Sequence, residues 1–171
     1  MDGTFDAVLF DRDGTLIRDV PYNGDPSVVT PMPGAREVLR ELRAQGVRTG
    51  VVTNQSGIGR GLLTHEQVAA VNARVDELFG RFGTWQICPH APDEGCACRK
   101  PAPGLVLAAC EALGVSPHRT LMVGDIGADV EAAEAAGAVS LLVPTEVTRA
   151  DEVARAPRTA DDLLAVLELV R

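Results

Sequence analysis

The residues most suited to chemistry are two aspartates, Asp11 and Asp13, which directly follow a short apolar run at residues 7–10 and precede Gly14. An apolar run of this length is typical of a buried parallel strand, which would carry both carboxylates at its carboxyl end. Side chains two residues apart lie on the same side of an extended chain, so the pair can face one substrate group. Two like charges this close need a cation, a proton or both. An ordinary solvated turn is the alternative interpretation of so short a pattern.

Hydrogen-bond donors follow the next predicted strand, which covers residues 47–52. A phosphoryl group presents only acceptors, so hydroxyls, amides and the backbone N–H groups of a glycine-rich loop are suited to bind it. Such a loop by itself more often indicates a flexible turn, but here it follows closely on the strand that carries the acidic pair. The candidate phosphate-binding residues in this stretch are Thr53, Asn54, Gln55, Ser56 and Arg60.

Three of the four cysteines and one of the three histidines fall within eleven residues, after a strand predicted at residues 84–87. Disulfides are disfavoured in the cytosolic protein expected here, and three thiolates with one imidazole supply the four ligands of a closed, structural zinc site. Free thiols or a redox pair are the alternatives. The predicted Zn²⁺ ligands are Cys88, His90, Cys96 and Cys98.

Two adjacent cations, Arg99 and Lys100, follow this cysteine-rich loop, and Lys100 is the only lysine of the chain. An arginine fork can bind a second phosphate or a carboxylate through two hydrogen bonds, whereas the lysine supplies a compact point charge. A further acid, Asp125, follows a strand predicted at residues 120–123 and is a candidate magnesium ligand. Asp129 lies one helical turn later and is either a group that supports the metal ligands or an acid at a helix start.

The motifs DRDGT, VVTNQSGIGRG, CRKPAPG and MVGD span about residues 7–143 and resemble those of the haloacid dehalogenase superfamily. Within that superfamily, the chain is most similar to the phosphatases of heptose bisphosphate and histidinol phosphate. The resemblance implies an enzyme, a phosphomonoester hydrolase that acts through an aspartyl-phosphate. Asp11 would be the nucleophile and Asp13 the general acid and base. Thr53 and Lys100 would neutralise charge that develops on the phosphoryl oxygens.

The resemblance also implies a catalytic Mg²⁺, because superfamily phosphatases of this kind hold three anionic groups together with one divalent ion. Its ligands here would be Asp11, the backbone carbonyl of Asp13, and Asp125. The Cys and His residues of the zinc loop match the place where the heptose enzymes carry C-x-H and C-x-C, which strengthens the prediction of a structural Zn²⁺.

A small phosphorylated metabolite is the implied partner, and the first expectation is removal of the 7-phosphate of D-glycero-D-manno-heptose 1,7-bisphosphate. Histidinol phosphate or another small phosphorylated metabolite is the alternative. Asp19, Tyr22 and Arg99 match positions that contact substrate in the heptose enzymes, although the first two could equally belong to an irregular surface connector. Ile126 departs from the pattern, because the heptose enzymes usually have lysine there.

The predicted strands alternate with predicted helices along the chain. This alternation indicates an α/β fold, a doubly wound, Rossmann-like parallel sheet with helices on both faces, which would position the candidate residues. The chain between residues 15 and 53 has no room for a large cap domain, and residues 1–171 are expected to form one domain with a small zinc-binding loop. Strands are predicted at residues 7–10, 47–52, 84–87, 120–123 and 139–143, and helices at 33–45, 64–81, 103–113, 131–136 and 161–170.

Composition excludes some partners. The formal net charge of −8 argues against a general affinity for nucleic acid or an anionic membrane surface. The chain is 46% apolar, yet no apolar run approaches the length of a signal or membrane segment, so we expect a cytoplasmic protein. The family resemblance suggests a monomer.

Two other function classes compete with a phosphatase. A phospho-accepting signalling receiver is also a doubly wound sheet with clustered aspartates, a threonine and a Lys-Pro pair. It does not need an acid two residues beyond its phosphorylated aspartate, so Asp13 and the zinc loop argue against it. A non-catalytic zinc interaction module would leave the acidic pair, Thr53 and Asp125 unexplained.

Overall fold

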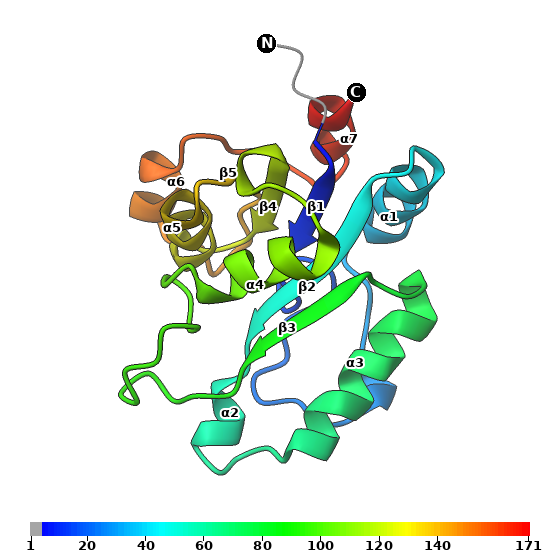
Figure 1. The fold of residues 1–171 in the computed structure, drawn as a ribbon. Helices are drawn as coiled ribbons and strands as arrows, with labels where there is room; N and C mark the ends of the chain where they lie inside the picture. Colours follow the sequence, from blue (N-terminus) through cyan, green and yellow to red (C-terminus); the bar gives the residue numbers. More distant parts are fainter. Residues whose placement is uncertain (1–4) are drawn as a thin grey trace.

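A five-stranded parallel sheet with helices on both faces forms the centre of the computed structural model, which describes residues 5–171 (Figure 1). The order of the strands is β3-β2-β1-β4-β5, and every neighbouring pair is parallel. The strands are β1 (Ala7–Phe10), β2 (Arg48–Asn54), β3 (Thr84–Cys88), β4 (Thr120–Gly124) and β5 (Val139–Leu142). The prediction of a doubly wound parallel sheet is therefore confirmed. Residues 1–4, part of the amino terminus expected to lack a targeting segment, lie outside the described residues.

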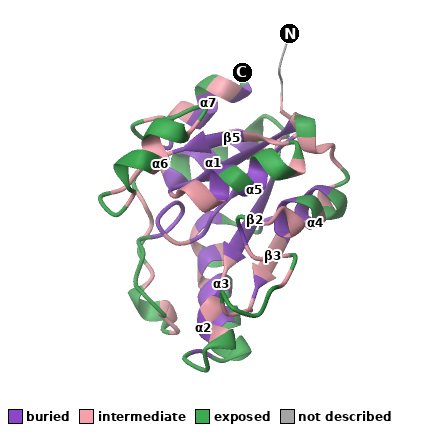
Figure 2. Ribbon diagram, turned by 90° about the vertical axis from the view of Figure 1, so that its left-hand side faces the viewer, coloured by how far each residue is buried: buried purple, intermediate pink, exposed green. Residues whose placement is uncertain are grey.

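The central strand β1 is apolar throughout because both of its faces are covered. All four of its side chains are completely buried, and alternate residues belong to different cores. Val8 and Phe10 pack in one hydrophobic cluster, whereas Leu9 packs in the other. A strand buried on both faces needs a continuous apolar run, which explains the sequence pattern. Figure 2 shows much of the sheet in purple, as buried, whereas the edge strand β3 is mostly pink, as intermediate.

Five helices cover the two faces of the sheet. The first hydrophobic cluster includes residues of α1, α3 and α7, and the second includes residues of α4 and α5. These helices are α1 (Ala35–Ala44), α3 (His65–Phe79), α4 (Gly104–Leu113), α5 (Gly127–Ala136) and α7 (Ala165–Val170). Helix α3 begins with a capping box, in which Thr64 and Gln67 exchange side-chain and backbone hydrogen bonds.

Several helix boundaries differ from the predicted ones. Two short helices, α2 (Ser56–Gly59) and α6 (Ala150–Arg155), were not predicted. Helix α5 starts at Gly127, four residues earlier than expected, because the Asp129 carboxylate accepts the N–H of Ile126 and caps the helix. Helix α7 starts later than predicted.

The late start of α7 has a local cause. The carboxylate of Asp162 accepts the N–H of Leu164 at 2.8 Å. This side-chain bond holds residues 161–164 in a turn that competes with helix formation.

The connection from β1 to α1 crosses the carboxyl edge of the sheet. Residues 11–34 form a loop with one 3₁₀-helix, Pro26–Val28, and add no separate cap domain. A second loop, residues 89–103, joins β3 to α4 and carries the cysteine cluster. None of the helices within residues 5–171 is both long enough and apolar enough to cross a membrane.

Candidate active site

A cleft of about 360 Å³ lies at the carboxyl edge of the sheet. This is the edge at which ligands bind in open α/β sheets. Most of the predicted site residues line it, although they come from four separate stretches of the chain. Those that line the cleft are Asp11, Asp13, Asp19, Tyr22, Asn54, Gln55, Ser56, Arg99, Lys100 and Asp125.

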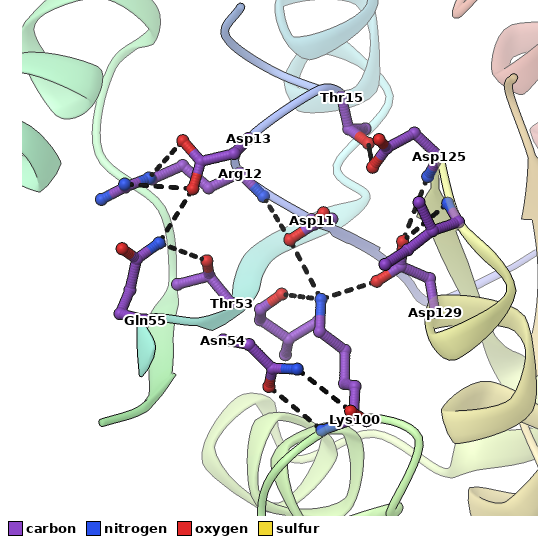
Figure 3. Close-up of polar contacts among 12 residues, drawn as sticks. Asp11, Arg12, Asp13, Thr15, Thr53, Asn54, Gln55, Lys100, Asp125 and Asp129 are labelled. Carbon is purple, nitrogen blue, oxygen red and sulfur yellow. Dashed lines mark hydrogen bonds and ion pairs between the residues drawn. The ribbon is translucent and has the colours of Figure 1, made fainter. Parts of the chain in front are cut away.

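At the base of the cleft, the ammonium group of Lys100 joins three chain segments (Figure 3). It donates to Asp11 Oδ1 at 3.0 Å, to Asp129 Oδ1 at 2.6 Å and to the backbone carbonyl of Val52 at 2.9 Å. An ammonium group has three donors, so all of them are used. The Lys100 side chain is only 3% exposed, which makes this a buried ion-pair network and not a surface contact.

The carboxylates of the cluster carry more negative charge than one lysine balances. Burial, together with the charge of Asp129, raises the pKa of Asp11 to about 6. Burial and the charges of Asp11 and Asp129 raise the pKa of Asp125 to about 9. Burial opposes the charged form of Lys100, but Asp11 and Asp129 outweigh it and raise the pKa of the ammonium group. A divalent cation would relieve this repulsion.

The cluster has the composition of a divalent-cation site. One oxygen from each of Asp11, Asp125 and Asp129 lies within 4.8 Å of the others, and all three residues are buried. Carboxylate oxygens are the ligands that Mg²⁺ prefers. The residues present therefore fit a hard divalent cation, because three buried carboxylates gather around a single lysine.

The role of Asp129, which the sequence left open, follows from its hydrogen bonds: both of its carboxylate oxygens accept from protein groups. Its Oδ1 accepts from Lys100, and its Oδ2 accepts the backbone N–H groups of Asp125 and Ile126 at 3.1 and 3.2 Å. A Cβ atom at position 124 would overlap the Asp129 carboxylate, so only glycine fits at this end of β4. Asp129 thus both caps α5 and holds Lys100.

Asp13 is held by two side chains that the sequence did not connect with it. The Arg12 guanidinium donates to both carboxylate oxygens of Asp13, at 3.2 and 3.1 Å, and Gln55 donates to Oδ2 at 2.9 Å. The remaining contact of Arg12 runs to Asn72 of α3, whose amide oxygen accepts at 2.8 Å. Sequence reasoning missed Arg12 and Asn72. Although Arg12 lies inside the DRDGT motif, nothing in the sequence pairs it with a residue sixty positions later.

Two predicted residues do not line the cleft. Thr53 is completely buried, and its hydroxyl accepts from the amide of Gln55 at 2.8 Å. Arg60 lines a separate hollow next to the cysteine-rich loop. Asn54 does line the cleft, and its amide group also exchanges two hydrogen bonds of 3.0 Å with the backbone of Lys100. This pairing fixes the start of the Lys100 side chain.

The four predicted zinc ligands lie together. Cys88 Sγ is 3.1 Å from Cys98 Sγ and 3.6 Å from Cys96 Sγ, and Nδ1 of His90 is 3.4 Å from Cys88 Sγ. A tetrahedral zinc site separates its sulfur and nitrogen ligands by about 3.5 to 3.8 Å, which is close to these distances. The backbone N–H of Arg99 donates to Cys96 Sγ and lowers the pKa of this thiol to about 6. A thiolate is the form that binds a metal.

Arg99 follows this cluster and lines the cleft, and its guanidinium group has no hydrogen bond or ion pair with the described residues. Its NH1 atom is buried and has no hydrogen-bond partner among the described residues. Buried donors without a partner are rare in folded proteins, so this nitrogen indicates a place for an anionic ligand group. Asp19 contributes an exposed carboxylate on the loop above, and partial desolvation, with the nearby Asp13, raises the pKa of that group.

The sequence and the structure are both similar to known proteins. Residues 22–137 match the family model described as haloacid dehalogenase-like hydrolase. A D-glycero-beta-D-manno-heptose-1,7-bisphosphate 7-phosphatase of Pseudomonas putida is 37% identical and covers 93% of this chain and 95% of its own. The Pseudomonas aeruginosa protein with the same name is also 37% identical, over 81% of this chain and 80% of its own.

Among solved structures, the D,D-heptose 1.7-bisphosphate phosphatase of B. bronchiseptica, complexed with magnesium and phosphate, superimposes with a TM-score of 0.83. The two proteins share 29% sequence identity, and the match covers 95% of this chain and 96% of the other. The similarity therefore extends through the whole fold and is not limited to the motifs.

The buried position of Lys100 leads to a stability prediction. Lys100→Met should lower the free energy of unfolding at pH 8 by about 3–5 kcal/mol in the absence of divalent ions, because it leaves buried carboxylates without their cation. Urea denaturation measures the loss. Arg40→Met, which removes an exposed ion pair on α1, should cost at most about 1 kcal/mol. Equal losses in the two variants would contradict the network described here.

Proposed function

This chain belongs to the haloacid dehalogenase-like hydrolase family, and on that basis we propose that it is a magnesium-dependent phosphatase that removes the 7-phosphate of D-glycero-D-manno-heptose 1,7-bisphosphate. The observation that carries the proposal is the meeting of Asp11, Lys100 and Asp125 in one buried cluster at the base of the cleft. The substrate comes from the names of relatives that match almost the full length of the chain.

In the proposed reaction, a carboxylate oxygen of Asp11 attacks phosphorus in line and forms an aspartyl-phosphate, and water then releases phosphate. The backbone N–H of Arg12 and the ammonium of Lys100 both donate to Oδ1 of Asp11. These two bonds fix the orientation of the carboxylate and leave Oδ2 to act as the nucleophile. Lys100 also offsets negative charge as the phosphoryl group approaches.

Asp13 is the proposed general acid and base. It protonates the leaving oxygen in the first step and takes a proton from the attacking water in the second. Arg12 and Gln55 hold its carboxylate in place, so it stays beside the reacting centre. Thr53 reaches the same network through Gln55, which supports an indirect role for its hydroxyl.

Mg²⁺ would be held by Asp11, the carbonyl of Asp13, and Asp125, and it would supply charge neutralisation between the phosphoryl group and the nucleophile. Asp129 would position two of these site residues, since its carboxylate accepts from the backbone N–H of Asp125 and from the Lys100 ammonium group. Thr15 adds a contact from the loop after β1, because its hydroxyl lies 3.3 Å from Asp125 Oδ1.

Zn²⁺ in the cluster of Cys88, His90, Cys96 and Cys98 would have a structural role, since the protein supplies all four ligands and leaves no open position. In the loop that carries the cluster, residues 89–103, Lys100 alone is buried, and the loop contributes few residues to either hydrophobic core. A metal would therefore replace a core in this loop and would fix the point from which Arg99 and Lys100 enter the cleft.

The substrate would lie across the cleft, with the reacting phosphate at Asp11 and its other phosphate near Arg99. The unpartnered NH1 of Arg99 supports this assignment. Asp19, Tyr22, Asn54 and Ser56 line the cleft and would contact the sugar, whereas Arg60 faces a separate hollow, which leaves its proposed contact without structural support.

Histidinol phosphate is a second candidate substrate, and the observation in its favour is Ile126. This side chain lines the cleft at the position where the heptose enzymes usually carry lysine, so the cleft has one cation fewer for a second phosphate. Rates with both anomers of heptose bisphosphate, histidinol phosphate and simple sugar phosphates, measured with magnesium, distinguish the two candidates.

We further propose that residues 1–171 act as one monomeric domain in the cytoplasm. None of the four cysteines forms a disulfide with another described residue, which is consistent with a reducing compartment.

The nucleophile assignment predicts the effect of one isosteric change. Asp11→Asn should reduce magnesium-dependent phosphate release at least about 1,000-fold, because an amide cannot form the covalent intermediate. Free phosphate is measured with substrate in excess, which also excludes a receiver that only accumulates the aspartyl-phosphate. Asp93→Asn, in the exposed loop outside the cleft, is the control and should keep its activity. Undiminished turnover in Asp11→Asn would show that another group attacks phosphorus.

The zinc assignment predicts a metal content. The purified protein should contain about one zinc ion per chain, and Cys98→Ser should lose most of it together with thermal stability. Cys110→Ser should retain the metal, because Cys110 lies on the buried side of α4, in the hydrophobic core, and is not part of the cluster. Elemental analysis by mass spectrometry measures both. Zinc-free wild-type protein of full stability would refute the assignment.

The Arg99 assignment predicts a loss that depends on the substrate. Arg99→Ala should lower kcat/KM for heptose bisphosphate about 10- to 100-fold, the value of hydrogen bonds to a charged group, and should change the rate with sugar monophosphates much less. Arg81→Ala, an exposed residue after α3, should behave like the wild type. Similar losses with both classes of substrate would mean that Arg99 does not bind the second phosphate.

A further inference from the structure

The junction between β4 and α5, residues 125–127, has backbone groups that neither element can satisfy. The residues that follow a strand no longer form hydrogen bonds with the neighbouring strands, and the first N–H groups of a helix have no partner within the helix. This junction also carries Asp125, and buried backbone groups need hydrogen bonds from elsewhere. Side chains from two different parts of the chain supply them.

Asp129, inside α5, accepts the N–H groups of Asp125 and Ile126. The other bonds come from the segment after β5. The hydroxyl of Thr148 lies 2.6 Å from the carbonyl oxygen of Asp125, and Glu152 Oε1 accepts the N–H of Gly127 at 3.1 Å. The backbone of Asp125 is thus held at its N–H by one segment and at its carbonyl by another.

The direction of the Thr148 bond is fixed by its second contact. The backbone N–H of Thr145 donates to the same hydroxyl at 2.8 Å, so the hydroxyl accepts there and its single proton is free for Asp125. The backbone N–H of Thr148 donates in turn to the carbonyl of Thr145 at 3.1 Å and closes the turn. Because the Thr148 hydroxyl both accepts and donates a hydrogen bond, its position and direction are fixed.

Glu152 supports the same arrangement. Its Oε1 accepts from Gly127, and its Oε2 accepts the N–H of Arg149 at 2.9 Å, at the start of α6. The Glu152 side chain is 13% exposed; its bond to Gly127 is partly buried, whereas its bond to Arg149 lies at the surface. The turn at residues 145–148 and the first turn of α6 therefore dock together on the strand end that presents Asp125.

We propose that Thr148 is a positioning residue for the catalytic metal ligand: its hydroxyl fixes the peptide that follows Asp125, and so fixes the direction of the Asp125 carboxylate toward a divalent cation. The inference rests on the proposed function, in which Asp125 is a ligand. Groups that orient a metal ligand commonly change metal affinity about 10- to 100-fold when removed. Thr148 touches neither the substrate nor the metal in this account.

The test is magnesium binding to the whole protein, followed by isothermal titration calorimetry. Thr148→Val keeps the shape of the side chain and removes the hydroxyl, and it should raise the dissociation constant for Mg²⁺ about tenfold. Thr148→Ser restores the hydroxyl and should return the constant to within about twofold of the wild type, a rescue that a purely packing role would not give.

A matched control lies at the other end of the same strand. The hydroxyl of Thr120, the first residue of β4, also donates to a backbone carbonyl, that of Ser116 at 3.0 Å. Thr120→Val should lower thermal stability about as much as Thr148→Val does and should leave magnesium binding unchanged. Similar Mg²⁺ constants for Thr148→Val and the wild type, or for Thr148→Val and Thr120→Val, would overturn the proposal.

A second measurement needs no variant. Coupling between two sites is reciprocal, so if the turn strengthens magnesium binding, magnesium must stabilise the turn by the same factor. Saturating Mg²⁺ should slow hydrogen exchange of the Thr145 amide about tenfold relative to that of Val115, at the far end of α4. Equal changes at the two amides would overturn the proposal even if Thr148→Val failed to fold.

Magnesium binding by the wild-type protein distinguishes a failure of the proposed function from a failure of the role proposed for Thr148. Wild-type protein that binds no Mg²⁺, like the reference variant Asp125→Asn, would overturn the proposed function and the role of Thr148 together. Wild-type protein that binds Mg²⁺ with an affinity that Thr148→Val shares would overturn only the role of Thr148.

Discussion

The structure depends on one buried cation. Lys100 places its ammonium group among the carboxylates of Asp11 and Asp129 and the carbonyl of Val52, at the point where three strands end. Without that charge, the raised pKa values of Asp11 and Asp125 would rise further, and burial of so many acids would be costly. The lysine does not balance the whole cluster, and the remaining negative charge would favour binding of a divalent ion.

The rest of the fold brings Lys100 to this point. Asn54, at the end of β2, holds the lysine backbone through two hydrogen bonds, and the cysteine cluster precedes it directly. Asp129 holds the side chain from the first turn of α5 while it caps that helix. A loop that lacks a hydrophobic core of its own thus contacts the sheet through Asn54 and carries the cysteine cluster next to Lys100.

The candidate site could be predicted from the sequence because its motifs are short and local. Asp11 and Asp13 at a strand end, the cysteine and histidine spacing, and the buried apolar run of β1 are local patterns that parallel sheets and metal sites require. Arg12 and Asn72 were missed for the opposite reason, since their contact joins residues sixty positions apart. The boundaries of α5 and α7 were misplaced because side-chain caps, and not helix propensity, decide where these helices start.

The sequence by itself determined the fold class, the family and the four stretches that meet at the sheet edge. These features are visible in the sequence because buried strands, tight turns and clustered ligand residues each need particular residue types within a few positions. The tertiary structure alone decided which donors remain free. It paired Asp129 with Lys100, buried Thr53 next to Gln55 and placed Arg60 at another hollow. It also left the buried NH1 of Arg99 without a partner among residues 5–171. These outcomes depend on distances between residues far apart in the chain, and such distances exist only once the sheet has formed.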